Sequence, residues 1–129
     1  MSVEARARAF TAEGRMLPEV RRFVADEAVR LAFATAIADL QLAVTEACAN
    51  SILHSGTDEI RVAIRPVGSC LEITVEDDGI YRQEVPFPEL DGQGHRGLHL
   101  MAAMVDDFSL RRGTANRQGT TVRLLKCRG

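Results

Sequence analysis

The sequence has 129 residues, of which 46% are hydrophobic and 26% are charged. This composition is typical of one ordinary globular domain and excludes a disordered tail or a fibre. The formal net charge of −2 argues against nucleic-acid binding through a strong positive field, and 5% aromatic residues with no tryptophan argue against base stacking as a main role.

The three cysteines are Cys48, Cys70 and Cys127, and no CxxC spacing occurs among them. We therefore expect free thiols in a reducing cytosol rather than structural zinc or a disulfide framework. The N-terminal segment carries charges where a signal peptide needs its apolar stretch. No uncharged run approaches the roughly 20 residues of a membrane span. These features predict a soluble, cytoplasmic protein with no membrane partner.

The first part of the chain predicts one strand and two helices. Small apolar residues alternate over 3–11, which indicates a strand. Pro18 suits the first turn of a helix, and apolar residues at helical spacing extend that helix over 18–32. A second helix is predicted over 37–54, with its small and apolar residues on one side.

The hydrophobic period then changes to two. Apolar and polar residues alternate over 60–65 and again over 71–76, which predicts two strands of one hairpin. The segment 66–69, Pro-Val-Gly-Ser, is predicted to be its turn. Residues 77–94 contain glycine and proline breaks without a clear period, which indicates a loop.

The remaining elements are a helix over 97–105 and a last hairpin, with strands at 108–112 and 120–126 around 113–119. Strands outnumber the long helices and are joined mostly by tight turns. The sequence therefore predicts a single α+β domain over 1–129, a two-layer sandwich with a mixed, mostly antiparallel sheet and helices on one face.

Glu46, Asn50 and His54 are spaced four residues apart on the second predicted helix, so they form one polar row. The opposite side of that helix carries Val44, Ala47 and Ser51. A solvated polar face explains such a row on its own. A functional interpretation is that something pairs these groups, because unpaired polar groups on an otherwise apolar helix are costly.

Three further segments have both an ordinary and a functional interpretation. Residues 75–79, Val-Glu-Asp-Asp-Gly, end a strand; they are either a tight turn or a buried carboxylate that receives an exocyclic amine. The glycine-rich run 92–98 leads into a helix, whose free N–H groups suit phosphate, but it has neither the P-loop nor the Rossmann pattern. Gly119, Thr120 and Thr121 open the last strand, as in many hairpins.

In this order and spacing the four features resemble the GHKL ATPase superfamily. Residues 43–55 are similar to its Asn box, 75–79 and 94–101 to its two Gly boxes, and 119–122 to its last motif. The short chain with a short lid, about 80–96, is most similar to bacterial anti-sigma-factor serine/threonine kinases. The resemblance implies the Bergerat-type ATP-binding fold, with ATP and Mg²⁺ as the nucleotide and metal.

The resemblance also implies roles for matching residues. Asn50 is expected to be a Mg²⁺ ligand, and Glu46 the general base that takes the proton of an incoming serine hydroxyl. Asp77 is expected to accept from the adenine amino group, and Gly79 to let the ring lie close. Thr121 is expected to support the adenine end.

The phosphates are expected to meet the second Gly box. The matching residues there are Gly94, Arg96, Gly97 and Leu98, and Arg96 can offer charge-assisted contacts. One residue departs from the family pattern, because Tyr81 stands where DxGxG has its second glycine. This substitution bears on the flexibility of the lid and on the strength of nucleotide binding.

The resemblance implies a kinase that phosphorylates a STAS-type anti-anti-sigma protein, sequesters a sigma factor and forms a homodimer, without direct contact to nucleic acid. Two alternatives stay open. One is a nucleotide-binding module that sequesters its partner with little kinase activity. The other is a switch kinase that acts on a scaffold protein and binds no sigma factor. Glu46 favours an enzyme, because pure sequestration needs no carboxylate one turn before a metal ligand.

Overall fold

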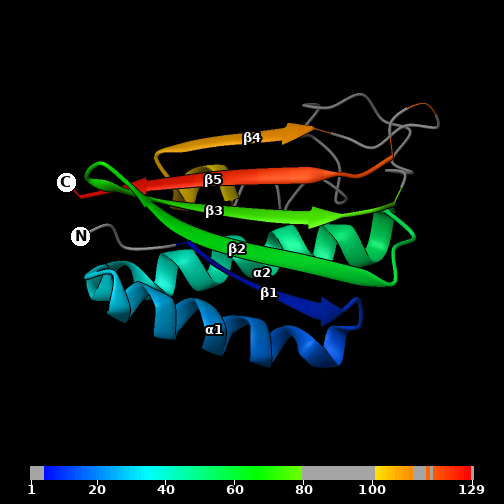
Figure 1. Ribbon diagram of the computed structural model, residues 1–129, viewed down its shortest axis with the longest axis horizontal. Helices are drawn as coiled ribbons and strands as arrows, with labels where there is room; N and C mark the ends of the chain where they lie inside the picture. The colour runs from blue at the N-terminus through cyan, green and yellow to red at the C-terminus, as the bar shows by residue number, and fades with distance from the viewer. Residues whose placement is uncertain (1–4, 80–100, 112–115, 117, 129) are drawn as a thin grey trace.

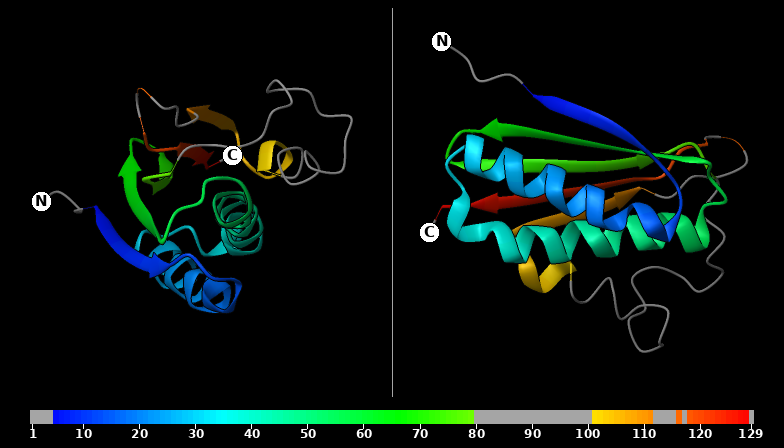
Figure 2. Two further views of the ribbon diagram at one scale, coloured as in Figure 1. Left: turned by 90° about the vertical axis from the view of Figure 1, so that its right-hand side faces the viewer. Right: turned by 90° about the horizontal axis from the view of Figure 1, so that it is seen from below.

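The computed structural model describes residues 5–79, 101–111, 116 and 118–128. These residues form an α+β fold in which a five-stranded sheet carries two long helices on one face (Figures 1 and 2). The elements are β1 (Arg6–Thr11), η1 (Gly14–Met16), α1 (Leu17–Arg30), η2 (Ala34–Ala36), α2 (Ile37–His54), β2 (Glu59–Val67), β3 (Cys70–Asp77), β4 (Asp107–Arg111) and β5 (Thr121–Cys127). The predicted fold class is confirmed.

The sheet has the order β1-β2-β3-β5-β4, and each of its four described pairings is antiparallel. Its register aligns apolar residues across the strands: Val75 lies opposite Val62 on one side and Val122 on the other. All three are buried, and they face the helices together with Ile64 and Leu124. The core therefore lies between this face of the sheet and the two helices.

The end of α1 is fixed by backbone hydrogen bonds. The Phe33 N–H donates to the Ala28 carbonyl at 2.7 Å, and the Ala32 N–H donates to the Val29 carbonyl at 3.1 Å, which is a Schellman motif. Ala32 has φ = 65°, a left-handed conformation that is usually left to glycine. This turn reverses the chain so that α2 packs beside α1.

The predicted hairpin turn at 66–69 was too long. Pro66 and Val67 belong to β2, where they lie opposite Leu71 and Cys70 of β3. The turn itself is Gly68 and Ser69, and Gly68 has φ = +59°. Proline lacks the N–H that a sheet needs, so sheets accept it mainly at edges, bulges and strand ends. Pro66 stands one residue from the end of β2.

The other boundaries agree to within a few residues, except where the chain is not described. The predicted helix over 97–105 is helical at 101–104, and its earlier residues lie outside the described part of the chain. The predicted loop 113–119 is described only at 116, 118 and 119. Neither long helix of the described chain is long and apolar enough to cross a membrane.

The expectation of free thiols was wrong for two of the three cysteines. Cys70 and Cys127 form a disulfide. They are 57 residues apart in sequence, but the β3–β5 register places them directly opposite one another, with 3.9 Å between their Cα atoms. Only Cys48 is free, and burial raises the pKa of its thiol to about 12.

Candidate functional site

The candidate site is built around Asp77, the last residue of β3. Its side chain lies on the helix-facing side of the sheet and is 1% exposed. Oδ2 accepts a hydrogen bond from the Ser51 hydroxyl at 2.6 Å, and Oδ1 accepts from the Gly79 N–H at 2.8 Å and from the Thr120 N–H at 3.3 Å. Donors from α2, from the residues that follow β3 and from the segment before β5 thus hold one buried carboxylate.

Sequence reasoning missed Ser51. It was placed on the small, apolar side of the second helix, and the structure confirms that this side faces the sheet. A hydroxyl at such a position, next to Asn50 and opposite a strand that ends in acids, was the signal that could have identified it. Because a buried hydroxyl needs a partner, Ser51 predicts a buried acceptor on the neighbouring layer.

Gly79 is required by a close backbone approach. A Cβ atom built at this position would lie 1.8 Å from the Ser55 carbonyl oxygen at the end of α2. Any side chain would therefore push β3 and α2 apart beside Asp77. On its other side, the Gly79 carbonyl accepts from the Gly119 N–H at 3.0 Å, which ties this segment to the start of β5.

Glu46 and Asn50 lie one turn apart on α2, as predicted. Glu46 is half-buried, whereas Asn50 is 9% exposed. Within the described part of the chain, the side-chain nitrogen of Asn50 is buried without a hydrogen-bond partner. A buried N–H donor of this kind needs an acceptor, which a ligand or a residue outside the described part of the chain would supply. His54, the third residue of the row, is half-buried.

The described contacts with Asp77 include neither Thr121 nor the residues predicted to bind phosphate. The Thr121 hydroxyl accepts from Arg111 at 3.0 Å on the opposite face of the sheet, and the neighbouring Thr120, 2% exposed, meets Asp77 instead. The expected phosphate residues, together with Tyr81, lie outside the described residues; they are Gly94, Arg96, Gly97 and Leu98.

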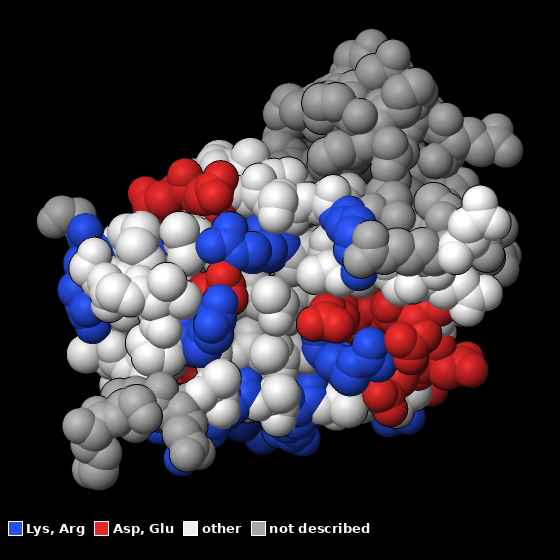
Figure 3. Space-filling model, turned by 45° about the horizontal axis from the view of Figure 1, so that its top comes forward, with Lys and Arg blue, Asp and Glu red and all other residues white. Residues whose placement is uncertain are grey.

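The next residue, Asp78, occupies a different environment. Its carboxylate is 76% exposed and receives two hydrogen bonds from the Arg61 guanidinium, at 3.0 and 3.1 Å. These bonds hold the pKa of Asp78 below its usual value. Arg61 is also 3.6 Å from Glu59 and 3.9 Å from Glu76, and this group of charges is visible on the surface in Figure 3. The Asp78 carboxylate is thus engaged by Arg61 at the surface, whereas the Asp77 carboxylate is buried against α2.

The residues present fit an adenine nucleotide with Mg²⁺. A carboxylate has about four acceptor positions, and the described residues use three on Asp77, which leaves one on Oδ2 for an exocyclic amine. The amide oxygen of Asn50 is a hard donor of the kind that Mg²⁺ prefers. No group of three or more acidic, histidine or cysteine side chains suited to a metal occurs among the described residues. Such a metal would thus rely on phosphate and water for its other ligands, as Mg²⁺ commonly does.

Comparison with known proteins supports this assignment. A profile of the histidine kinase-like ATPase domain matches residues 10–126. The histidine kinase domain of the blue-light activated histidine kinase EL346 from Erythrobacter litoralis has a TM-score of 0.61 and 17% identity, covering 92% of this chain and 61% of that one. The histidine kinase AdeS from Acinetobacter baumannii has a TM-score of 0.55 and 10% identity, covering 97% and 68%. At these identities the two structures show a shared fold alone. No curated protein matches the sequence.

Proposed function

Because the chain belongs to the histidine kinase-like ATPase domain family, we propose that it is an ATP-dependent protein-serine/threonine kinase. Its substrate would be a STAS-type anti-anti-sigma protein, and it would sequester a sigma factor. The observation that carries the nucleotide-binding part is the buried Asp77 carboxylate, which is held by donors from three segments and keeps one acceptor position. The serine specificity and the partners rest on the sequence resemblance.

In the proposed reaction, Asp77 accepts from the adenine amino group while Ser51 and Thr120 hold its carboxylate in place. This arrangement selects adenine over guanine, which carries a carbonyl where adenine has its amine. Gly79 keeps the backbone after β3 against the end of α2, because any Cβ here would collide with the Ser55 carbonyl; that it also lets the ring lie close rests on the sequence resemblance. These residues bind and orient the nucleotide and take no part in bond making.

Glu46 is the proposed general base. It is half-buried on α2, one helical turn before Asn50, and would take the proton of the acceptor hydroxyl as the γ-phosphoryl group of ATP is transferred to that oxygen. Asn50 would hold Mg²⁺ through its amide oxygen. When bound, Mg²⁺ neutralises charge on the phosphates, which is the main requirement of phosphoryl transfer besides positioning.

The test is to incubate the protein with MgATP and a STAS-domain protein encoded beside it, and to measure the mass gained by that protein. We expect one phosphoryl group on a serine. Glu46→Gln should bind MgATP with unchanged affinity but transfer at least about 10²-fold more slowly in a single turnover. Asp77→Asn should lose ATP affinity, because its amide places N–H donors where a pure acceptor is needed.

Glu76→Gln is the matched control. Glu76 precedes Asp77 on β3 but faces the other side of the sheet, where it is 47% exposed, so its loss should change neither binding nor transfer. Transfer by Glu46→Gln at the wild-type rate would contradict the assignment of the base. ATP binding and sigma-factor capture without any transfer would instead support the sequestering module. Transfer to a scaffold protein without sigma binding would support the switch kinase.

A further inference from the structure

The Cys70–Cys127 disulfide lies at the end of the sheet opposite to Asp77. Cys70 begins β3 and Cys127 ends β5, whereas Asp77 stands at the other end of β3. In Figure 1 this end of the sheet is the one near the C-terminus. The pair therefore lies apart from the nucleotide site, and an inference drawn from it does not rest on the proposed kinase activity.

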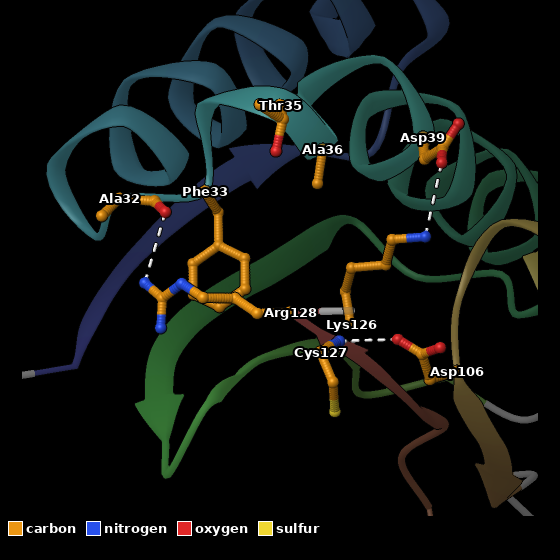
Figure 4. Close-up of a pocket in the computed structure, with 9 residues that line it drawn as sticks. All are labelled: Ala32, Phe33, Thr35, Ala36, Asp39, Asp106, Lys126, Cys127 and Arg128. Carbon is orange, nitrogen blue, oxygen red and sulfur yellow. Dashed lines mark hydrogen bonds and ion pairs between the residues drawn. The ribbon is translucent and has the colours of Figure 1, made fainter.

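Both cysteines are open to exchange with small thiols. Their side chains share the face of the sheet that no described helix covers, because Leu71 and Leu124 alternate with them toward the core. Each residue is partly exposed. Figure 4 shows the sulfur of Cys127 pointing away from the neighbouring pocket. Exchange requires access of a thiolate to a disulfide sulfur, and this placement provides it.

The disulfide holds a segment that joins the two layers of the fold. The Cys127 N–H donates to Asp106 at 2.6 Å, and the Arg128 N–H donates to the Ser69 carbonyl at 3.1 Å. The Arg128 guanidinium then crosses to the helices: it donates to the carbonyls of Leu31 and Ala32 at 3.0 and 3.2 Å.

The same guanidinium lies 4.1 Å from the centre of the Phe33 ring. It thereby places a positive charge at the C-terminal end of α1, where the helix dipole favours one. Lys126 reaches the other helix, 3.4 Å from Asp39 of α2. These residues line a pocket of about 540 Å³ between the end of β5 and the connection from α1 to α2 (Figure 4).

We propose that Cys70 and Cys127 form a reversible thiol–disulfide exchange site, and that its reduction loosens the end of β5 from the α1–α2 connection. In reduction, a thiolate of a small dithiol attacks one of the two sulfurs, and the protein S–S bond breaks with its electron pair left on the other sulfur, which takes up a proton. The second thiol of the reagent resolves the mixed disulfide. The protein gains two electrons and two protons, and the dithiol becomes a disulfide. Glutathione disulfide drives the reverse reaction.

The first experiment equilibrates the full chain in glutathione buffers whose reduced-to-oxidised ratio is varied over several decades, followed by alkylation and mass measurement. We expect a single transition between a form with one alkylated thiol, measured after denaturation, and a form with three. Cys48→Ser should keep the transition, since Cys48 is buried and its pKa is raised to about 12. Three alkylated thiols in every buffer, or one in every buffer, would overturn the proposal.

The second experiment compares hydrogen exchange of the oxidised and the dithiothreitol-reduced wild-type protein. Reduction should speed exchange of the Cys127 and Arg128 amides by about 10-fold or more and leave the Gly79 amide unchanged. It should also lower Tm by about 10 °C, as loss of a cross-link that closes a long loop does. Equal exchange at 127 and 128 in both forms would show that the disulfide does not hold this segment. Because both forms come from the wild-type chain, the result does not depend on a cysteine variant folding.

Discussion

Two hydroxyls on α2 offer a direct test of how Asp77 is held. Ser51 donates its hydroxyl to Asp77 at 2.6 Å inside the protein. Thr45, six residues earlier on the same helix, has a buried hydroxyl oxygen with no partner among the described residues. Ser51→Ala removes a hydroxyl that is used, and Thr45→Val removes one for which the described part of the chain offers no partner.

The expected magnitudes differ in sign as well as size. A hydrogen bond to a charged group contributes about 1.5–3 kcal/mol, and Ser51 and Asp77 are 3% and 1% exposed, so the substitution leaves a buried carboxylate with one donor fewer. Ser51→Ala should therefore lower the free energy of unfolding by about 2 kcal/mol, with Tm falling by roughly 5–10 °C. Thr45→Val replaces an unpaired buried hydroxyl by a methyl group and should leave stability unchanged or raise it by up to about 1 kcal/mol.

Urea unfolding with linear extrapolation measures both variants, with unchanged m values as the sign that both still unfold in one step. Wild-type stability in Ser51→Ala would refute the argument that this hydroxyl supports the buried carboxylate. An equal loss in both variants would show that any substitution inside α2 disturbs its packing, so that the hydrogen bond itself contributes little.

Two other regions of the fold lead to separate predictions. Ala32→Gly should raise the free energy of unfolding by about 1 kcal/mol, because φ = 65° strains alanine but not glycine. Ala34→Gly, nearby, is the control and should not stabilise the protein. A lower unfolding free energy of Ala32→Gly in denaturant titrations would contradict the role of strain. Hydrogen bonds from Arg65 first, and also from Arg123, hold the pKa of Glu72 below its ordinary value of 4.5. The ionised Glu72 therefore stabilises the fold above about pH 4.5, and this contribution is lost as the pH falls through the lowered pKa. The difference in unfolding free energy between wild type and Glu72→Gln should consequently shrink in acid. A difference that stays constant in urea titrations from pH 7 down to acid unfolding would contradict this.

Most of the fold could be predicted because its elements have strong periods. The alternation of Ile60, Val62 and Ile64 is the alternation that the register needs to bury one face of β2. The second helix was predicted with the bounds observed for α2. The turn after β2 was misplaced because Pro66 was interpreted as a turn residue, although its fixed φ is also compatible with the end of a strand.

Contacts between distant segments could not be predicted. Nothing in the sequence shows that Cys70 lies opposite Cys127, because this depends on the order and register of β3 and β5. The same holds for Ser51, whose importance appears only when α2 packs over the end of β3. Thr121 was predicted for the adenine end of the site instead of Thr120 for a related reason. The register decides which of two adjacent residues faces the core, and a shift of one residue exchanges their faces.

The donors that hold Asp77 have a consequence for how the chain becomes functional during synthesis. Ser51 precedes Asp77 by 26 residues and Thr120 follows it by 43. Because β5 pairs with β3, a nascent chain that has not reached β5 leaves that edge of β3 unpaired, and open edges recruit foreign strands. Docking of β5 covers the edge, and it brings Thr120, the residue before β5, to the Asp77 carboxylate. A chain that lacks β5 would consequently lack the assembled nucleotide site. Nucleotide binding during refolding would then report that β5 has docked.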